Sequence, residues 1–119
     1  MSQSRMHRGY QTQKLAAVYL RRWWPYAEPV GAGRAGADIT GVPFDIELKA
    51  RSRVDLPLLM RQLATRKDGR IGFGVLRLNG QGPASIGDWV AVMRFADLVE
   101  LLAEHYNVSP DELPEELQP

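Results

Sequence analysis

The residues best suited to chemistry are two acids and a lysine near the middle of the chain, Asp38, Glu47 and Lys49. Residues 44–49 alternate apolar and charged side chains, which is the period of a half-buried strand. Residues 37–40 form a shorter strand candidate, and the intervening Gly41-Val42-Pro43 has the composition of a turn. A hairpin with a two-residue loop pairs position 38 with 47, so the two carboxylates and the ammonium share one face. Such a group can hold Mg²⁺ or Mn²⁺ beside a polarised water.

The same alternation predicts which side of the second strand faces the core. The apolar residues Phe44, Ile46 and Leu48 are expected to face inward, and Asp45, Glu47 and Lys49 to face the opposite side. The competing interpretation is an exposed cross-strand ion pair, which stabilises a sheet by only a few tenths of a kcal/mol, roughly. The surrounding elements are needed to decide between the two.

Length and composition favour one compact soluble domain. The chain has 119 residues, of which 45% are hydrophobic and 24% charged, and it contains no cysteine. A disulfide framework and a thiolate zinc site are therefore excluded. No apolar run approaches the roughly 20 residues that span a bilayer, and the polar start lacks a signal-peptide core, so no membrane association and a cytoplasmic location are expected. We expect a single domain over residues 1–108 and an acidic, proline-containing tail over 109–119.

Charge is divided unevenly along the chain. Residues 1–70 hold 13 Lys/Arg and 6 acids, a balance of +7, whereas residues 71–119 hold 2 and 8, a balance of −6. A basic region around an acidic centre is typical of a surface that attracts polyanions. DNA is therefore the expected partner, although a solvated charged face remains the plainer alternative.

Periodicity predicts the remaining elements. Residues 10–24 and 95–106 have the spacing of amphipathic helices, and Asp55 is a reasonable N-cap for a helix from 56 to about 67. Residues 71–78, rich in glycine and apolar side chains, predict a central strand, and residues 89–94 predict another. The order is helix, two or three antiparallel strands, helix, strand, strand, helix.

One glycine-rich stretch has the pattern of a dinucleotide-binding loop. Gly31-Ala-Gly33-Arg-Ala-Gly36 matches G-x-G-x-x-G, but that fingerprint requires a helix opening at the glycines. Gly41 and Pro43 follow too closely for such a helix. No nucleotide cofactor is therefore expected, and a loop that brings Arg34 to a phosphate is as plausible as a simple connector.

Asp38 on one strand and Glu47-Leu48-Lys49 on the next resemble the signature of the PD-(D/E)XK nuclease superfamily. The expected element order also resembles the αβββαβ core of that superfamily, a restriction-endonuclease-like α/β fold with a mixed sheet flanked by helices. Within it, the chain is most similar to small archaeal and phage-type Holliday junction resolvases. Gly9-x-x-x-Gln13 falls where those enzymes carry a glycine followed four residues later by a metal-associated glutamate.

The resemblance implies a Mg²⁺- or Mn²⁺-dependent endodeoxyribonuclease that cuts branched DNA. Asp38, Glu47 and the Leu48 carbonyl would hold the metal, and Lys49 would orient water or contact phosphate. Gln13 stands where the family has an acid, and Ala37 where the superfamily name has a proline. The DNA-binding candidates are Lys14, Arg34, Arg51, Arg53, Arg61 and Gln62.

A junction needs two cuts, so a symmetric homodimer is expected, and a phage or mobile-element origin is a hypothesis. Trp23, Trp24, Trp89 and residues 71–78 are candidate interface residues. Two alternatives stay open. One is a nuclease of the same fold with another task, such as a nicking, flap or restriction-type enzyme. The other is a non-catalytic DNA-binding protein that has kept the fold.

Overall fold

The computed structural model describes residues 3–31, 36–50, 53–66 and 69–119. Within these ranges the chain forms three α-helices, two small sheets and two 3₁₀ turns, so it is a mixed α/β protein as expected. The elements in chain order are α1 (Gln3–Leu20), β1 (Glu28–Pro29), β2 (Ile39–Thr40), β3 (Asp45–Lys49), α2 (Leu56–Thr65), β4 (Gly72–Leu76), η1 (Pro83–Asp88), β5 (Val90–Val92), α3 (Phe95–Tyr106) and η2 (Glu115–Leu117).

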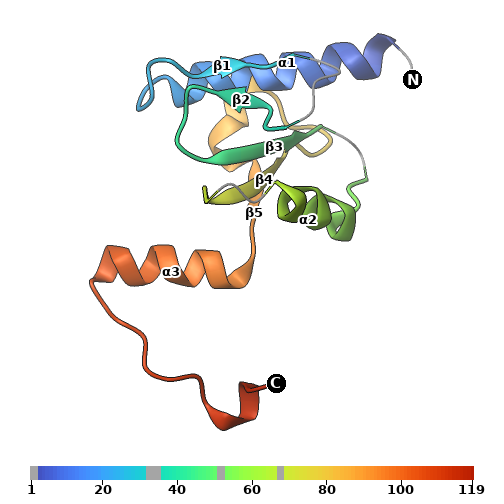
Figure 1. Cartoon of the computed structure of the whole chain (residues 1–119). Coiled ribbons are helices and arrows are strands. Elements are labelled where there is room, and N and C mark those ends of the chain that lie inside the picture. Colours follow the sequence, from blue (N-terminus) through green and yellow to red (C-terminus); the bar gives the residue numbers. More distant parts are fainter. Residues whose placement is uncertain (1–2, 32–35, 51–52, 67–68) are drawn as a thin grey trace.

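A mixed three-stranded sheet of order β3-β4-β5 lies at the centre of the molecule. β4 is parallel to β3 and antiparallel to β5. Since parallel neighbours need a crossover connection, α2 lies between β3 and β4 in the sequence. α1 lies on one side of the sheet and α2 on the other (Figure 1). The central position of β4 confirms its prediction as an inner strand.

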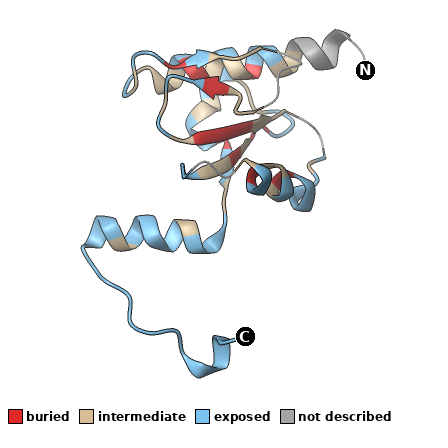
Figure 2. Ribbon diagram, in the orientation of Figure 1, coloured by how far each residue is buried: buried red, intermediate tan, exposed pale blue. Residues whose placement is uncertain are grey.

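Two apolar clusters fill the two sides of this sheet. Under α1, Ala16 and Ala17 are buried against Ile46 and Trp89, because their small side chains let the helix approach the strands. Under α2, Leu59 and Leu63 pack with Leu76. The buried positions therefore gather in the sheet and on the helix surfaces that face it (Figure 2).

Glycine at position 74 sets how closely α2 approaches β4. A Cβ at Gly74 would lie 2.6 Å from a Leu59 methyl carbon and 3.1 Å from Val92. Such contacts are closer than side chains tolerate, so Gly74→Ala would push α2 away from the sheet. Gly74 is thus a position where close packing requires glycine.

The hairpin predicted from the sequence is wrong in its pairing. β2 pairs with β1, and β3 pairs with β4, so residues 38–40 do not form a ladder with residues 45–47. One backbone hydrogen bond joins the segments, from the Asp38 amide to the Ile46 carbonyl at 2.9 Å. β1 was not predicted from the sequence, and it pairs with β2 in place of β3. Asp38 lies next to Ile46 instead of opposite Glu47.

The expected outward face of β3 is also buried. Asp45 is 1% exposed and Glu47 is 8% exposed, because α2 and the Arg66 side chain cover that side of the strand. Apolar and charged residues of β3 thus both face protein. Burial on both sides is normal for a strand in a parallel pair.

The predicted helices agree with the structure to different degrees. α3 has the predicted bounds, and the Asp55 carboxylate caps α2 by accepting from the Leu58 amide at 3.0 Å. α1 is displaced from the predicted 10–24 because it begins at Gln3 and ends at Leu20, where Trp24 N–H bonds the Leu20 carbonyl in a closing turn.

No helix among the described residues is long and apolar enough to cross a membrane.

Two of the tryptophans expected at an interface lie inside the fold. Trp89 is 8% exposed in the α1 cluster, and the Trp24 ring packs edge-on against Phe44 at 4.9 Å between centroids. Trp23 is 54% exposed. An interface built on all three tryptophans is therefore ruled out.

Candidate active site

Asp38 is held by two hydrogen bonds from opposite directions. Its Oδ2 accepts from the Leu48 amide at 2.7 Å, which fixes the carboxylate against the edge of β3. Its Oδ1 accepts from the Gln13 side-chain amide of α1 at 3.2 Å. Gln13 is itself oriented, because its oxygen accepts from the Gly31 amide at 3.1 Å. Gln13 therefore presents an NH₂ group to Asp38, while its oxygen faces the backbone.

Asp38 and Glu47 interact with each other in the site. The pKa of Asp38 is raised to about 6, chiefly by burial and then by the charge of Glu47 and a hydrogen bond with it, whereas the hydrogen bond from the Leu48 amide acts in the opposite direction. Lys49 has the opposite, smaller effect on that pKa. Two carboxylates in a partly desolvated place repel each other unless a proton or a cation lies between them.

Glu47 connects the site to two cations. Its Oε1 lies 3.5 Å from the Lys49 ammonium, and its Oε2 lies 3.4 Å from Nη2 of Arg66. Arg66 also donates two bonds to Asp45, at 3.0 and 3.1 Å. Burial alone lowers the pKa of Arg66, but the Asp45 bond and the charges of Glu47, Asp45 and Asp38 outweigh it and raise the pKa. Arg66 thus holds the carboxylates of Asp45 and Glu47 in place.

The donor set fits a hard divalent cation such as Mg²⁺. Asp38 and Glu47 provide carboxylate oxygens, the ligand type that this ion prefers. In an extended strand the N–H and C=O of one residue point to the same edge, so the Leu48 carbonyl faces the edge at which its N–H meets Asp38. Among the described residues no group of three or more acidic, histidine or cysteine side chains could hold a metal, so the carboxylates would act as a pair.

Four sequence-predicted catalytic residues therefore come together: Gln13, Asp38, Glu47 and Lys49. A small pocket of about 20 Å³ opens beside them and is lined by Lys49, Val54 and Gln62, among others. The side-chain oxygen of Gln62 is buried there without a hydrogen-bond partner among the described residues. Gln62, named from the sequence as a DNA contact, lines the same pocket as Lys49.

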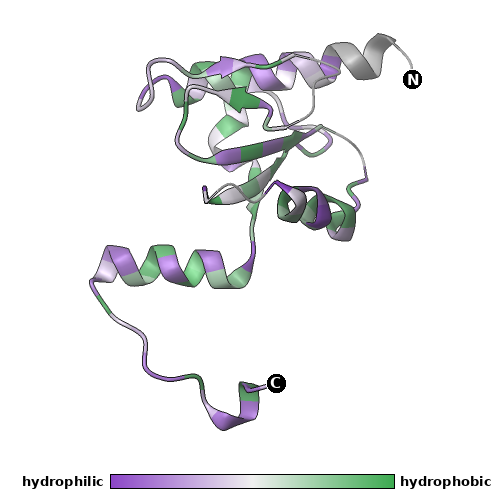
Figure 3. Ribbon diagram, viewed as in Figure 1, coloured by the Kyte–Doolittle hydropathy of each residue, from purple (hydrophilic) through white to green (hydrophobic). Residues whose placement is uncertain are grey.

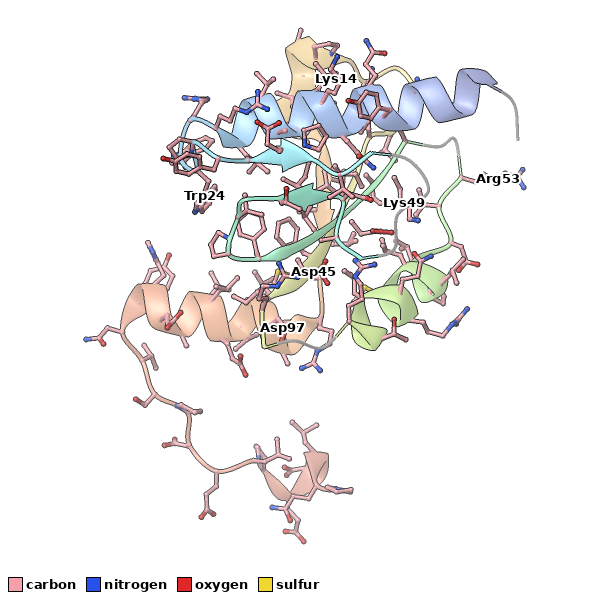
Figure 4. The ribbon with its side chains drawn as sticks, turned by 45° about the horizontal axis from the view of Figure 1, so that its top comes forward. Lys14, Trp24, Asp45, Lys49, Arg53 and Asp97 are labelled. Carbon is pink, nitrogen blue, oxygen red and sulfur yellow. The ribbon has the colours of Figure 1, made fainter. Side chains whose placement is uncertain are left out.

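The predicted DNA-binding residues are spread over several places. In Figure 4 Arg53 extends outward at the same end of the molecule as Lys49, whereas Lys14 lies on the other side of α1. Arg61 is exposed on α2. Arg34 and Arg51 lie outside the described residues. Of these candidates, Arg53 and Gln62 are thus the ones best placed beside the site.

Sequence reasoning missed two arginines that meet on the α1 side of the sheet. Arg77 is 8% exposed, and its guanidinium donates to Thr12 at 3.0 Å and stacks over Trp89 at 5.3 Å. Burial, and then the charge of Arg8, lower the pKa of Arg77. Nη2 of Arg8 is buried with no partner in the described part of the chain. This pair adds positive charge, and no local sequence pattern predicts it.

Gln13 provides a direct test of how α1 contributes to the site. Gln13→Glu is expected to preserve or raise metal-dependent cleavage, because a carboxylate beside Asp38 adds an oxygen ligand. Gln13→Leu removes the bond to Asp38 and is expected to lower cleavage about 10- to 100-fold, the usual effect of losing a group that orients a ligand. Single-turnover rates would measure both. Equal rates for the two variants would mean that α1 serves only as a scaffold.

The raised pKa of Asp38 predicts that the metal-free protein loses stability as the pH rises. Between the ordinary value of 3.8 and about 6, the folded state keeps a proton that the unfolded state has lost, so the stabilisation is complete below 3.8 and lost above 6. The expected loss is about 1–2 kcal/mol, less than the full shift because the group is partly solvated.

Asp38→Asn should flatten this dependence. Urea unfolding in chelator at pH 4, 5, 6 and 7 would compare the variant with the original chain, so that other titrating groups cancel. Parallel pH profiles for the two proteins would contradict the assignment of the proton to Asp38.

Comparison of the chain with family models, with curated proteins and with solved structures finds no match. The site therefore has to be interpreted from its own geometry.

Proposed function

We propose that this chain is a metal-dependent endodeoxyribonuclease of the PD-(D/E)XK type that cuts branched DNA, with the four-way junction as its preferred substrate. The observation that carries the proposal is the convergence of Asp38, Glu47 and Lys49 at one strand edge, with Gln13 behind them. The elements that hold them follow the order α1-β1-β2-β3-α2-β4, with β4 parallel to β3. That order resembles the αβββαβ order of the superfamily, although β1 and β2 form a sheet separate from β3 and β4 in this chain.

Each residue has a role that follows from its contacts. Asp38, Glu47 and the Leu48 carbonyl would hold Mg²⁺ or Mn²⁺, which when bound lowers the pKa of water and offsets charge on the phosphate. Gln13 and the Leu48 amide keep Asp38 in one orientation. Lys49, whose side chain is 17% exposed, is placed to contact the phosphate or to orient the attacking water.

Positive charge around the site supports a polyanionic substrate. Arg53, at the same end of the molecule as Lys49 in Figure 4, and Arg61 on α2 are both exposed. Such side chains bind backbone phosphates and carry no base code, which suits recognition by DNA shape.

Binding is consequently expected to weaken steeply with salt. If about four to six phosphates are neutralised, affinity should fall roughly 300- to 6,000-fold between 50 and 250 mM salt, because bound counterions are released. Fluorescence anisotropy with a junction and Ca²⁺ or chelator in place of Mg²⁺ measures this without cleavage. A flat salt dependence would contradict a phosphate-gripping surface.

The experiment that tests the function is cleavage of an end-labelled four-way junction beside duplex, flap and single-stranded DNA. With Mg²⁺ or Mn²⁺, paired cuts in strands of like polarity are expected in the junction, and none in chelator. Equal cutting of duplex or flap DNA would favour a nuclease of this type with another task.

A non-catalytic DNA-binding protein is the second candidate. It is favoured by one observation, that the Gln13 oxygen is engaged by the Gly31 amide and so is turned away from Asp38. Tight junction binding without cleavage under any divalent metal would establish this second function.

A further inference from the structure

The C-terminal helix α3 is amphipathic, yet the described part of the chain buries none of its residues. Its large apolar side chains are Phe95, Leu98, Val99, Leu101, Leu102 and Tyr106, and they are between 36% and 80% exposed. No residue of α3 is buried, and the helix extends away from the sheet (Figures 1 and 2). The radius of gyration is 16.0 Å, against about 13–14 Å for a compact chain of this length. A helix with such a face needs a partner to cover it.

The charge of this arm indicates what kind of partner suits it. Residues 95–119 contain seven acids and no Lys or Arg, a balance of −7, so residues 1–94 carry 15 bases and 7 acids, a balance of +8. In Figure 3 apolar and polar bands alternate along α3. The complementary surface is therefore basic with exposed apolar side chains.

The same chain offers such a surface at the C-terminal end of α1, which we call the Trp23 surface. It consists of Val18, Arg22, Trp23 and Tyr26, with the three apolar members 58%, 54% and 81% exposed in that order. The Arg22 guanidinium lies 4.8 Å from the centre of the Trp23 ring. Arginine over an aromatic ring combines charge with apolar area, as interface anchors do.

α3 lies away from the Trp23 surface of its own copy. α1 and α3 lie on opposite sides of the sheet in Figure 1. Only Met93 and Arg94 connect β5 to α3, so the start of α3 stays close to the end of this edge strand. A second copy has no such constraint.

We propose that the chain forms a symmetric dimer in which α3 of each copy packs on the Trp23 surface of the other. Twofold symmetry makes every such contact twice, so two modest surfaces together form a stable interface. Trp24, beside this surface, lies at the far side of the molecule from Lys49 and Arg53 in Figure 4, so the candidate active sites stay open. This inference does not rest on nuclease activity.

Light scattering on the full chain at micromolar concentration tests it, with an expected mass of twice 13.4 kDa. Leu102→Asp, in the middle of the apolar face, is expected to raise the dimer dissociation constant at least 100-fold. Ala96→Asp, which adds the same charge on the polar side of α3, should have little effect. Trp23→Ala should weaken the dimer at least 10-fold, and Tyr10→Ala, at an exposed aromatic elsewhere on α1, should not.

Trp23→Ala separates this exchange from a dimer of two α3 helices, which that change would leave unaffected. A Leu102→Asp copy mixed with a Trp23→Ala copy keeps one contact whole and places both changes in the other, so the mixed dimer should be tighter than the dimer of Leu102→Asp copies. Circular dichroism would confirm that every variant remains folded. A monomeric original chain, or a dimer unaffected by Leu102→Asp or by Trp23→Ala, would overturn the proposal. Because this experiment measures mass, a failure of the dimer proposal can be told apart from a failure to cut DNA.

Discussion

Arg66→Ala is expected to lower the free energy of unfolding by about 3–5 kcal/mol, the range measured when one partner of a buried ion pair is removed. Asp45 is 1% exposed, and Arg66 is its bidentate partner at 3.0 and 3.1 Å. Without the guanidinium, the carboxylate stays buried and unpaired, or takes up a proton at a free-energy cost. Urea unfolding at pH 7 measures the change.

Two further variants locate the effect. Arg61→Ala removes an exposed arginine from the same helix and is expected to change stability by no more than about 0.5 kcal/mol. Asp45→Ala combined with Arg66→Ala should cost less than Arg66→Ala alone, because no charge is left buried. If Arg66→Ala and Arg61→Ala were equally mild, the buried pair would have no structural importance.

The Arg66 variant also bears on the active site. Nη2 of Arg66 lies 3.4 Å from Glu47, so its removal leaves the Glu47 carboxylate with Lys49 as its remaining cation. Cleavage should therefore fall in Arg66→Lys, which keeps a charge but cannot hold Asp45 and Glu47 with a planar fork. In the proposed function Arg66 would position Glu47 without contacting the reacting phosphate.

Local patterns predicted much of the fold. Alternation marked β3, the N-cap Asp55 marked the start of α2, and spacing gave the bounds of α3. These signals involve neighbours within a few residues, so they are visible without the fold. α1 was displaced by seven residues at its start, because its polar first turns carry no apolar period.

Pairing and burial were harder to predict because they depend on distant segments. β1 has two residues, Glu28 and Pro29, and a proline in so short a segment gives no strand pattern. Yet β2 pairs with β1 and not with β3, so the predicted hairpin does not form. Likewise, Asp45 was expected to face solvent because α2, which covers it, comes later in the chain.

The candidate site shows the same division. Asp38, Glu47 and Lys49 could be named from a stretch of twelve residues, and the structure brings them together through contacts of Leu48. Arg66 lies 21 residues from Asp45, and Arg77 lies 65 residues from Thr12. No local sequence pattern connects such residues, so the cations around the carboxylates could be identified only from the structure.

Asp38→Asn, Glu47→Gln and Lys49→Met are each expected to lower cleavage of a labelled junction by about 100- to 1,000-fold or more. The first two keep shape and hydrogen bonding but remove a carboxylate charge that would bind the metal. The third removes the ammonium that lies 3.5 Å from Glu47. Single-turnover rates at saturating protein report the chemical step without the contribution of affinity.

Junction binding in the same variants distinguishes lost chemistry from lost structure. Asp38 and Glu47 repel the phosphate backbone, so Asp38→Asn and Glu47→Gln should bind the junction at least as tightly as the original chain in chelator. Asp55→Asn, at the N-cap of α2 and at the rim of the pocket, is a matched control that removes one carboxylate outside the cluster and should cut nearly as fast. Near-normal cleavage in any two of the three site variants would remove the assigned site. Loss of both binding and cleavage would show that these residues stabilise the fold and do not act on the reacting phosphate.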